Sequence, residues 1–198
     1  MRVALAWAAR HCRETVSNGG SCIDEVHRQF GRPAREAYCA KLVWVIAEEA
    51  ARAAGIRNPV PKTPGACDML QQAIKIGLRV DKTPGVGAIF YRSSKLTNSS
   101  GHVGLTIDMN DSTIRTVEGN NDDRIDDWSY PMSTVLHFPR HKTCQRGEGW
   151  DFIHIEDAGG AASVVSAGVS TAGPSFGSIA LTIGALAGAY FTTKQLKH

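Results

Sequence analysis

The spacing of apolar residues changes once along this 198-residue chain, near Thr83, and that change limits the folds open to it. Before Thr83 apolar residues recur every three or four positions, which is typical of helices with one buried face. After Thr83 they alternate with polar residues, which is typical of strands with one buried face. Helices followed by an antiparallel meander predict an α+β fold, in which the helices pack on a sheet.

Four helices are expected in the first part. The first would turn five residues inward: Leu5, Ala8, Ala9, Cys12 and Val16. Ser21 can cap the second, whose inner face would comprise Ile23, Val26, His27 and Phe30. The third begins at Cys39 and stops at Gly55, with Lys41 on its polar side. Thr63-Pro64 would start the fourth, because proline is favoured in the first turn of a helix.

Five strands are expected in the second part, over residues 88–91, 102–108, 113–118, 135–138 and 150–155. Residues 102–108 and 113–118 would form a hairpin through a short loop at Asn110. The acidic run between them and the later strands, residues 122–127, lacks the pattern of an EF-hand and is interpreted as a solvated turn.

Residues 158–193 contain no charged side chain and differ in composition from everything before them. Residues 158–175 are small and flexible, which predicts a linker after a domain at 1–157. Residues 176–193 are mostly apolar and just reach the length of about 17 residues that a membrane helix needs. Gly184 and Gly188 have the spacing of closely packed membrane helices. We expect 176–198 to be a membrane-inserting tail; the alternative is a buried or low-complexity segment.

The composition argues against several classes of function. A net charge of +3 without a Lys/Arg-rich run does not indicate nucleic-acid binding. Five cysteines without a CxxC pair, together with the absence of HxH and HExxH, indicate no metal, and no cofactor is expected. A Cys12–Cys22 disulfide could form, but reduced thiols are the preferred interpretation. Arg10 interrupts a short apolar N-terminal run, so no cleaved signal peptide is predicted.

Cys39, His102 and Glu118 could form a nucleophilic site. A thiol in the first turn of a helix is biased toward thiolate by the helix dipole, and a histidine with an orienting partner can exchange its proton. His102 opens one strand of the hairpin and Glu118 closes the other. A three-residue loop would pair residue 102 with residue 118, whereas a two-residue turn would send Glu118 to the other face. Asn120 is a second candidate for orienting His102.

Three segments then carry a resemblance to a known family: Ala37-Tyr38-Cys39-Ala40, Gly101-His102-Val103-Gly104 and Thr116-Val117-Glu118-Gly119-Asn120. In this order they resemble the CHAP domain, the cysteine, histidine-dependent amidohydrolase/peptidase family of papain-like peptidoglycan hydrolases. The strand start at residues 84–89 is similar too, although it lacks the acidic residue often found there. The resemblance covers roughly residues 3–155.

The resemblance implies a papain-like fold and cleavage of a peptidoglycan amide, by an amidase or an endopeptidase. Cys39 would attack the carbonyl carbon, His102 would act as base and then acid, and Glu118 or Asn120 would orient His102. The backbone N–H of Cys39 would stabilise the oxyanion, and Tyr38 would either add a donor or pack.

Such an enzyme fits a phage lytic protein, carried in the virion or anchored in a membrane facing the wall. A bacterial toxin or wall-remodelling enzyme is also open. A rival hypothesis is a structural or assembly protein, anchored in a membrane or particle, that retains the fold without the activity.

Overall fold

The structure is a computed structural model, and it describes residues 1–32, 35–93, 101–136 and 149–155. The chain divides into two compact units, 1–168 and 169–198, and the second lies outside the described residues. The expected linker (158–175) and apolar tail (176–198) also lie outside them. Among the described helices, none has the length and apolar character needed to cross a membrane.

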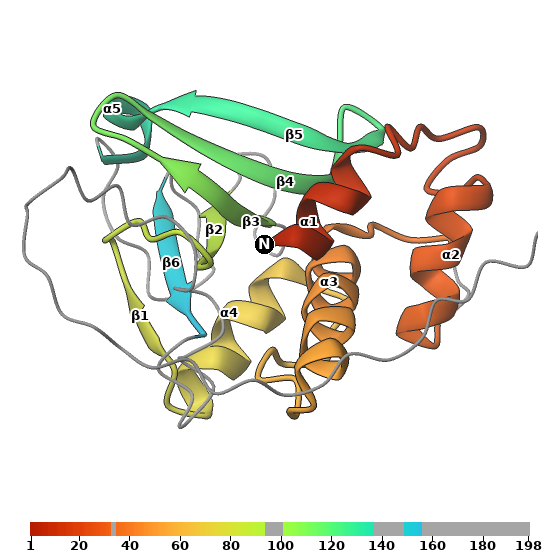
Figure 1. Cartoon of the computed structure of the whole chain (residues 1–198), viewed down its shortest axis with the longest axis horizontal. Coiled ribbons are helices and arrows are strands. Elements are labelled where there is room, and N and C mark those ends of the chain that lie inside the picture. The colour runs from red at the N-terminus through yellow and green to blue at the C-terminus, as the bar shows by residue number, and fades with distance from the viewer. Residues whose placement is uncertain (33–34, 94–100, 137–148, 156–198) are drawn as a thin grey trace, which may run out of the picture. The chain divides into compact units, whose positions relative to one another are not determined.

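The first unit has an α+β fold (Figure 1), which confirms the predicted fold class. Its helices are α1 (Arg2–Ala8), α2 (Ser21–Phe30), α3 (Cys39–Ala54), α4 (Ala66–Lys75) and α5 (Met132–Leu136). Its strands are β1 (Arg79–Asp81), β2 (Ile89–Ser93), β3 (Gly101–Met109), β4 (Thr113–Asn121), β5 (Arg124–Pro131) and β6 (Trp150–His154). They form one sheet in the order β1-β6-β2-β3-β4-β5, in which neighbouring strands are antiparallel.

The helices before the sheet begin and end close to where the sequence predicts them. Both α2 and α3 end at a glycine in the left-handed conformation, Gly31 (φ 85°) and Gly55 (φ 68°), which satisfies the last carbonyl groups. The inner face predicted for the first helix is right for Ala8 and Cys12, which are buried, and wrong for the rest. Because α1 ends at Ala8 and His11 turns the chain with φ 46°, Val16 is not on this helix and is exposed. Leu5 and Ala9 are exposed as well, and Ala4 and Trp7 are buried in their place.

Two predictions for the second part are also wrong. Only Asp122 and Asp123 form a turn, with φ of 50° and 54°, and the chain returns at once as β5. The charges on β5 remain compatible with a strand because Arg115 and Asp127 form an ion pair at 2.7 Å. Residues 135–136 belong to α5 rather than to a strand over 135–138, since β5 stops at Pro131, which cannot donate to the ladder. Residues 137–138 lie outside the described part.

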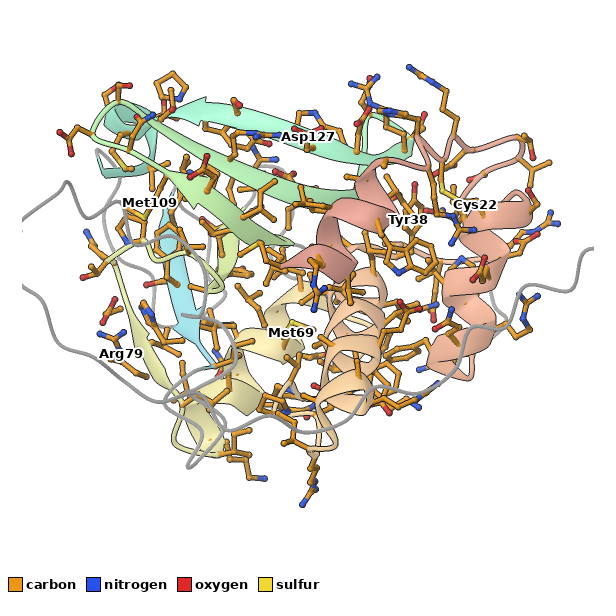
Figure 2. The ribbon with its side chains drawn as sticks, viewed as in Figure 1. Cys22, Tyr38, Met69, Arg79, Met109 and Asp127 are labelled. Carbon is orange, nitrogen blue, oxygen red and sulfur yellow. A yellow bond between two sulfur atoms is a disulfide. The ribbon has the colours of Figure 1, made fainter. Side chains whose placement is uncertain are left out.

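Two apolar layers cover the two faces of the sheet. On one face, Ile89, Tyr91, Val103 and Leu105 belong to the core that the sheet shares with α1 to α4. Figure 1 shows α1, α3 and α4 beneath strands β3 to β5, and Figure 2 shows Met69 of α4 in this interior. On the other face, a smaller cluster comprises Ala88, Phe90, Ile114, Met132, Val135, Trp150 and Phe152. The pleat therefore sends Ile89 and Tyr91 of β2 to one layer and Phe90 to the other.

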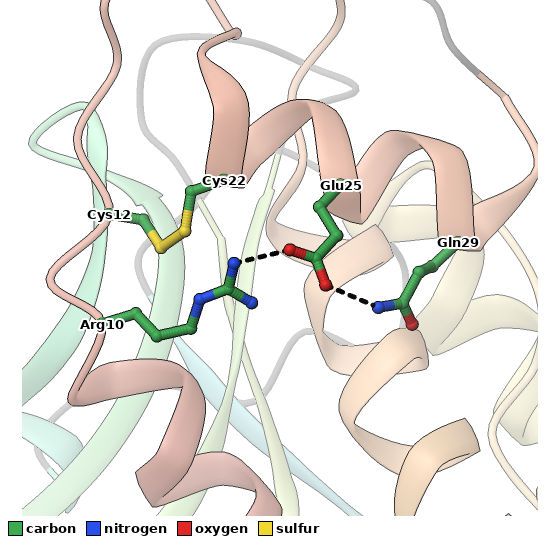
Figure 3. Close-up of a disulfide and its surroundings, with 5 residues drawn as sticks. All are labelled: Arg10, Cys12, Cys22, Glu25 and Gln29. Atoms are coloured by element: carbon green, nitrogen blue, oxygen red, sulfur yellow. Dashed lines mark hydrogen bonds and ion pairs between the residues drawn. A yellow bond between two sulfur atoms is a disulfide. The ribbon is translucent and has the colours of Figure 1, made fainter.

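A disulfide joins Cys12, which follows α1, to Cys22 in the first turn of α2 (Figure 3), so the preferred interpretation of reduced thiols is wrong. A tight turn between the two cysteines, in which Val16 pairs with Gly19, brings their Cα atoms to 5.8 Å, within the usual range for a disulfide. Beside it, Arg10 and Glu25 form an ion pair at 2.5 Å. Cys67 is also disulfide-bonded, and Cys39 is the free thiol of the described part.

Candidate active site

Cys39 is the first residue of α3 and is 5% exposed. Its N-cap, Tyr38, provides no side-chain hydrogen bond, so the first N–H groups of the helix are available to other acceptors. Burial alone raises the pKa of the thiol, but hydrogen bonds from His102 and from the backbone N–H groups of Val103 and Ala40 outweigh it. The pKa of Cys39 is consequently lowered. The surroundings therefore favour the thiolate.

His102 lies between Cys39 and Glu118 and contacts both. Its Nε2 is 2.7 Å from Glu118 Oε2, which leaves Nδ1 as the nitrogen that can face the sulfur. Burial by itself lowers the pKa of the imidazole. The hydrogen bonds and charges of Cys39 and Glu118 outweigh burial and raise the pKa of His102 to about 9. The imidazolium is therefore favoured at neutral pH, between a thiol whose pKa is lowered and a carboxylate.

Glu118 is fully buried and is held by three further groups. Thr116 Oγ1 donates to its Oε1 at 2.5 Å, Asn121 Nδ2 donates to its Oε2 at 2.9 Å, and the Tyr130 hydroxyl also hydrogen-bonds to it. Burial raises the pKa of this carboxyl, but His102 and these donors outweigh it, so the pKa of Glu118 is lowered. The carboxylate is thus charged and fixed in place.

The predicted pairing of residue 102 with residue 118 is wrong by two residues. Glu118 lies opposite Gly104, and the register shifts between Thr106 and Asp108 because Ile107 is an extra residue in β3. Since side chains alternate with a period of two, a shift of two positions keeps His102 and Glu118 on one face as diagonal neighbours. The two side chains meet even though the register differs.

Cys39 reaches His102 where β3 and β4 separate. The last residue pair between these strands is Gly104 with Glu118, and Asn120 then turns β4 away with φ 59°. Thr106 directs its backbone groups to the β2 side, donating to the Ala88 carbonyl at 2.9 Å. Alternation along β3 then directs the Val103 N–H to the β4 side. The Val103 N–H donates to Cys39, so the sulfur lies on the β4 side of β3.

Glycines in two of the motifs permit this close packing. A Cβ on Gly104 would lie 2.7 Å from Glu118 Cγ, and a Cβ on Gly119 would lie 2.9 Å from Leu42 Cδ2 and 3.0 Å from the Tyr38 ring. These distances are shorter than van der Waals contact. The glycines therefore allow Glu118 to lie over β3 and the first turn of α3 to lie against β4.

The other residues predicted for the site have different positions. Within the described residues, no hydrogen bond joins the side chain of Asn120 to His102. Tyr38 is fully buried, with its ring at an edge-to-face angle of 81° to His27, so it packs in the core. Burial and the Glu14 carboxylate raise the pKa of Tyr38. Asn121 and Tyr130 were not predicted, since both depend on the turn into β5.

Lys41 is fully buried, although the helical pattern predicts it on a polar face. Its Nζ lies 3.0 Å from His27 Nδ1 and 2.8 Å from Glu36 Oε1. His27 Nε2 donates to the Asn18 carbonyl at 2.9 Å, so His27 Nδ1 is free to accept from the ammonium. These contacts connect α2 to the first turn of α3, two residues from Cys39.

Comparisons with known proteins provide only weak similarity. No family model matches the chain, and no curated protein matches it. One solved structure that is similar is an N-acetylmuramoyl-L-alanine amidase from Staphylococcus aureus, with 15% sequence identity and a TM-score of 0.39. The match covers 56% of this chain and 29% of the amidase. A TM-score this low does not establish a common fold, so the function depends on the site itself.

Proposed function

We propose that this protein is a CHAP-type cysteine hydrolase that cleaves an amide bond of peptidoglycan. The observation that carries the proposal is the position of His102. Its ring lies between the sulfur of Cys39, which starts helix α3, and the carboxylate of Glu118. This arrangement provides a nucleophile, a proton carrier and an orienting group. The three short segments that resemble the CHAP family contain all of these residues.

In the first half of the reaction the Cys39 thiolate attacks the carbonyl carbon of the substrate. A C–S bond forms, and the negative charge on the carbonyl oxygen is stabilised by N–H groups of the first turn of α3. His102 gives its proton to the amide nitrogen as the C–N bond breaks, and the amine leaves. Cys39 then carries the acyl group as a thioester.

In the second half water attacks the thioester while His102 takes one of its protons. The C–S bond breaks, the acyl group leaves as a carboxylic acid, and the thiolate–imidazolium pair is restored. Glu118 holds the ring through Nε2 in both halves, and its charge favours the imidazolium in the free enzyme, before attack and after release of the acid.

The substrate assignment depends on the resemblance of the motifs. Under it, the protein is a lytic enzyme of phage type, located in the virion or held at a membrane by residues 176–198. The rival hypothesis is an assembly protein that retains the fold. A charged His102–Glu118 pair is costly to bury, and a purely structural role gives no reason for a thiolate beside it.

Loss of turbidity of purified cell walls tests the proposal. We expect Cys39→Ala and His102→Ala to abolish lysis while the proteins remain folded by circular dichroism. His11→Asn is a matched control and should remain active, because this exposed histidine forms a surface pair with Asp126 and asparagine tolerates its φ of 46°. Mass analysis of released fragments would identify the new amine and carboxyl ends. Lysis by purified Cys39→Ala protein would refute the proposal.

A further inference from the structure

Arg92 lies directly beside the candidate site, on the neighbouring strand. In the pairing of β2 with β3, Arg92 is opposite His102, so both side chains project from the same face of the sheet. The Arg92 guanidinium carbon lies 5.6 Å from the ring centre of Tyr130 and 5.7 Å from that of Trp150. Both distances are within the range of cation–π contacts. The two rings therefore fix the guanidinium over the face of the sheet from which His102 projects.

No carboxylate among the described residues forms an ion pair with Arg92. The nearest buried acid of the site, Glu118, is already engaged by His102, Thr116 and Asn121. Stacking on aromatic faces leaves the edge of a guanidinium, with its N–H groups, available for an anion. Arg92 is half-buried, so this edge is partly shielded from water, which strengthens a contact with an anion.

Cross-strand pairing gives Arg92 a defined place relative to the reaction. Arg92 is the neighbour of His102 across β2 and β3. Its guanidinium contacts the ring of Tyr130, whose hydroxyl hydrogen-bonds to Glu118, the partner of His102. An amide bound for attack has its carbonyl carbon at Cys39 and its nitrogen toward His102. The part of the substrate beyond that nitrogen therefore extends toward Arg92.

We propose that Arg92 is a specificity-determining residue that binds a carboxylate on the amine side of the scissile bond. The inference rests on the proposed function, because it takes the direction of the substrate from the roles of Cys39 and His102. Arg92 and His102 are paired on adjacent strands, so the carboxylate belongs to the part of the substrate that follows the scissile nitrogen. Stem peptides of peptidoglycan carry such free carboxylates, and amidation removes their charge.

The test compares two substrates that differ only in this charge. Soluble muropeptides are used either with free carboxyl groups or after conversion of these groups to amides with ammonium and a carbodiimide. For the wild-type enzyme we expect KM to be about tenfold lower on the free form, the lower range for a hydrogen bond to a charged group at a partly exposed site. Arg92→Gln should raise KM about tenfold on the free form alone, with kcat changed by less than about threefold.

Two controls separate recognition from folding. Arg92→Lys retains the charge without the planar fork and should restore part of the preference. Arg52→Gln removes the same charge 13 positions along α3 from Cys39, about 20 Å away, and should behave as wild type. Equal KM values of wild type and Arg92→Gln on the free form would overturn the inference. An equal rise of KM for Arg92→Gln on the amidated form would also overturn it, because Arg92 would then affect the structure of the site rather than bind the carboxylate.

The outcome is distinguishable from failure of the proposed function. If the wild-type enzyme cleaves muropeptides and Cys39→Ala does not, the proposed function holds whatever the result for Arg92. If the wild-type enzyme cleaves nothing, the proposed function fails. Equilibrium dialysis of the two muropeptide forms against the Cys39→Ala protein then still decides the inference. This protein should bind the free form more tightly than the amidated form. The preference should disappear in the double variant Cys39→Ala, Arg92→Gln. Equal binding of both forms by the Cys39→Ala protein would overturn it.

Discussion

Replacing Glu118 with glutamine removes one charge from the site while keeping a side chain that can still accept a hydrogen bond from His102. The carboxylate is fully buried and lies 2.7 Å from Nε2 of His102, so its charge acts at short range without screening by solvent. The main expected effect of Glu118→Gln is therefore a lower pKa of His102. The position of the ring should change little.

The size of the effect can be worked out from the pKa of His102. This pKa is raised from 6.5 to about 9, which corresponds to about 3 kcal/mol in favour of the imidazolium. An opposite charge at close range changes a pKa by about 1–3, so Glu118→Gln should lower the pKa of His102 to about 7.5. At pH 8.5 the protonated fraction of His102 would fall from about three quarters to about one tenth, an eightfold loss. At pH 6.5 it would fall by only about a tenth.

The initial rate of wall lysis between pH 5 and pH 10 measures this directly. The rate should fall through pH about 9 in the wild-type enzyme and through pH about 7.5 in Glu118→Gln, because the imidazolium must protonate the leaving amine. The rate of alkylation of Cys39 by iodoacetamide, followed by peptide mapping, gives an independent pH profile of the Cys39 thiolate. Glu48→Gln, which removes an acid paired with Arg52 at the surface, is the control. If Glu118→Gln and wild type have the same alkaline limb, the reasoning about Glu118 is wrong.

Three further predictions concern packing, the disulfide and the tail. Gly104→Ala would put a methyl group 2.7 Å from Glu118 Cγ, so lytic activity should be largely lost and the free energy of unfolding, from urea titration, lowered by about 1–3 kcal/mol. Replacing Cys12 and Cys22 with serine opens a bridge of sequence separation 10, which should lower the free energy of unfolding by about 2.5–3 kcal/mol, while lysis by the folded protein continues. Removing 158–198 should leave lysis of purified walls intact and abolish flotation with lipid vesicles; flotation of the shortened protein would contradict a membrane role for the tail.

Local signals in the sequence predicted the elements that depend on local chemistry. The start of α3 at Cys39 and its end at Gly55 were predicted because a change in apolar spacing and a glycine stop mark them. Strand β1, with three residues, is too short to show any alternation. Strand β5 was missed because its acidic residues resemble a solvated turn, whereas Arg115 and Arg124 pair with them in the sheet. The Cys12–Cys22 bridge depends on the turn at residues 16–19; the sequence 17–20 marks a turn there, but it does not reveal that the two cysteines meet.

For the candidate site, the side chains that share a face could be predicted, but their register could not. The period of two placed His102 and Glu118 on one face, and it holds for any even shift. The actual register depends on the extra residue Ile107, which alternation does not reveal. The burial of Lys41 depends on His27 from another helix. The catalytic roles of the site residues stay a prediction.

The separation of β3 from β4 explains why this nucleophile is a helix-start cysteine rather than a residue of the sheet. Where the strands part, the Val103 N–H loses a partner on β4, and an unsatisfied buried N–H costs about 1–3 kcal/mol. The sulfur of Cys39 accepts this N–H together with that of Ala40. The same contacts that satisfy the backbone at the break in the sheet also stabilise the thiolate. Where β3 and β4 part, the free backbone N–H groups are best satisfied by a charged acceptor, which is the Cys39 thiolate. The same position places the sulfur beside His102, the residue that takes up its proton.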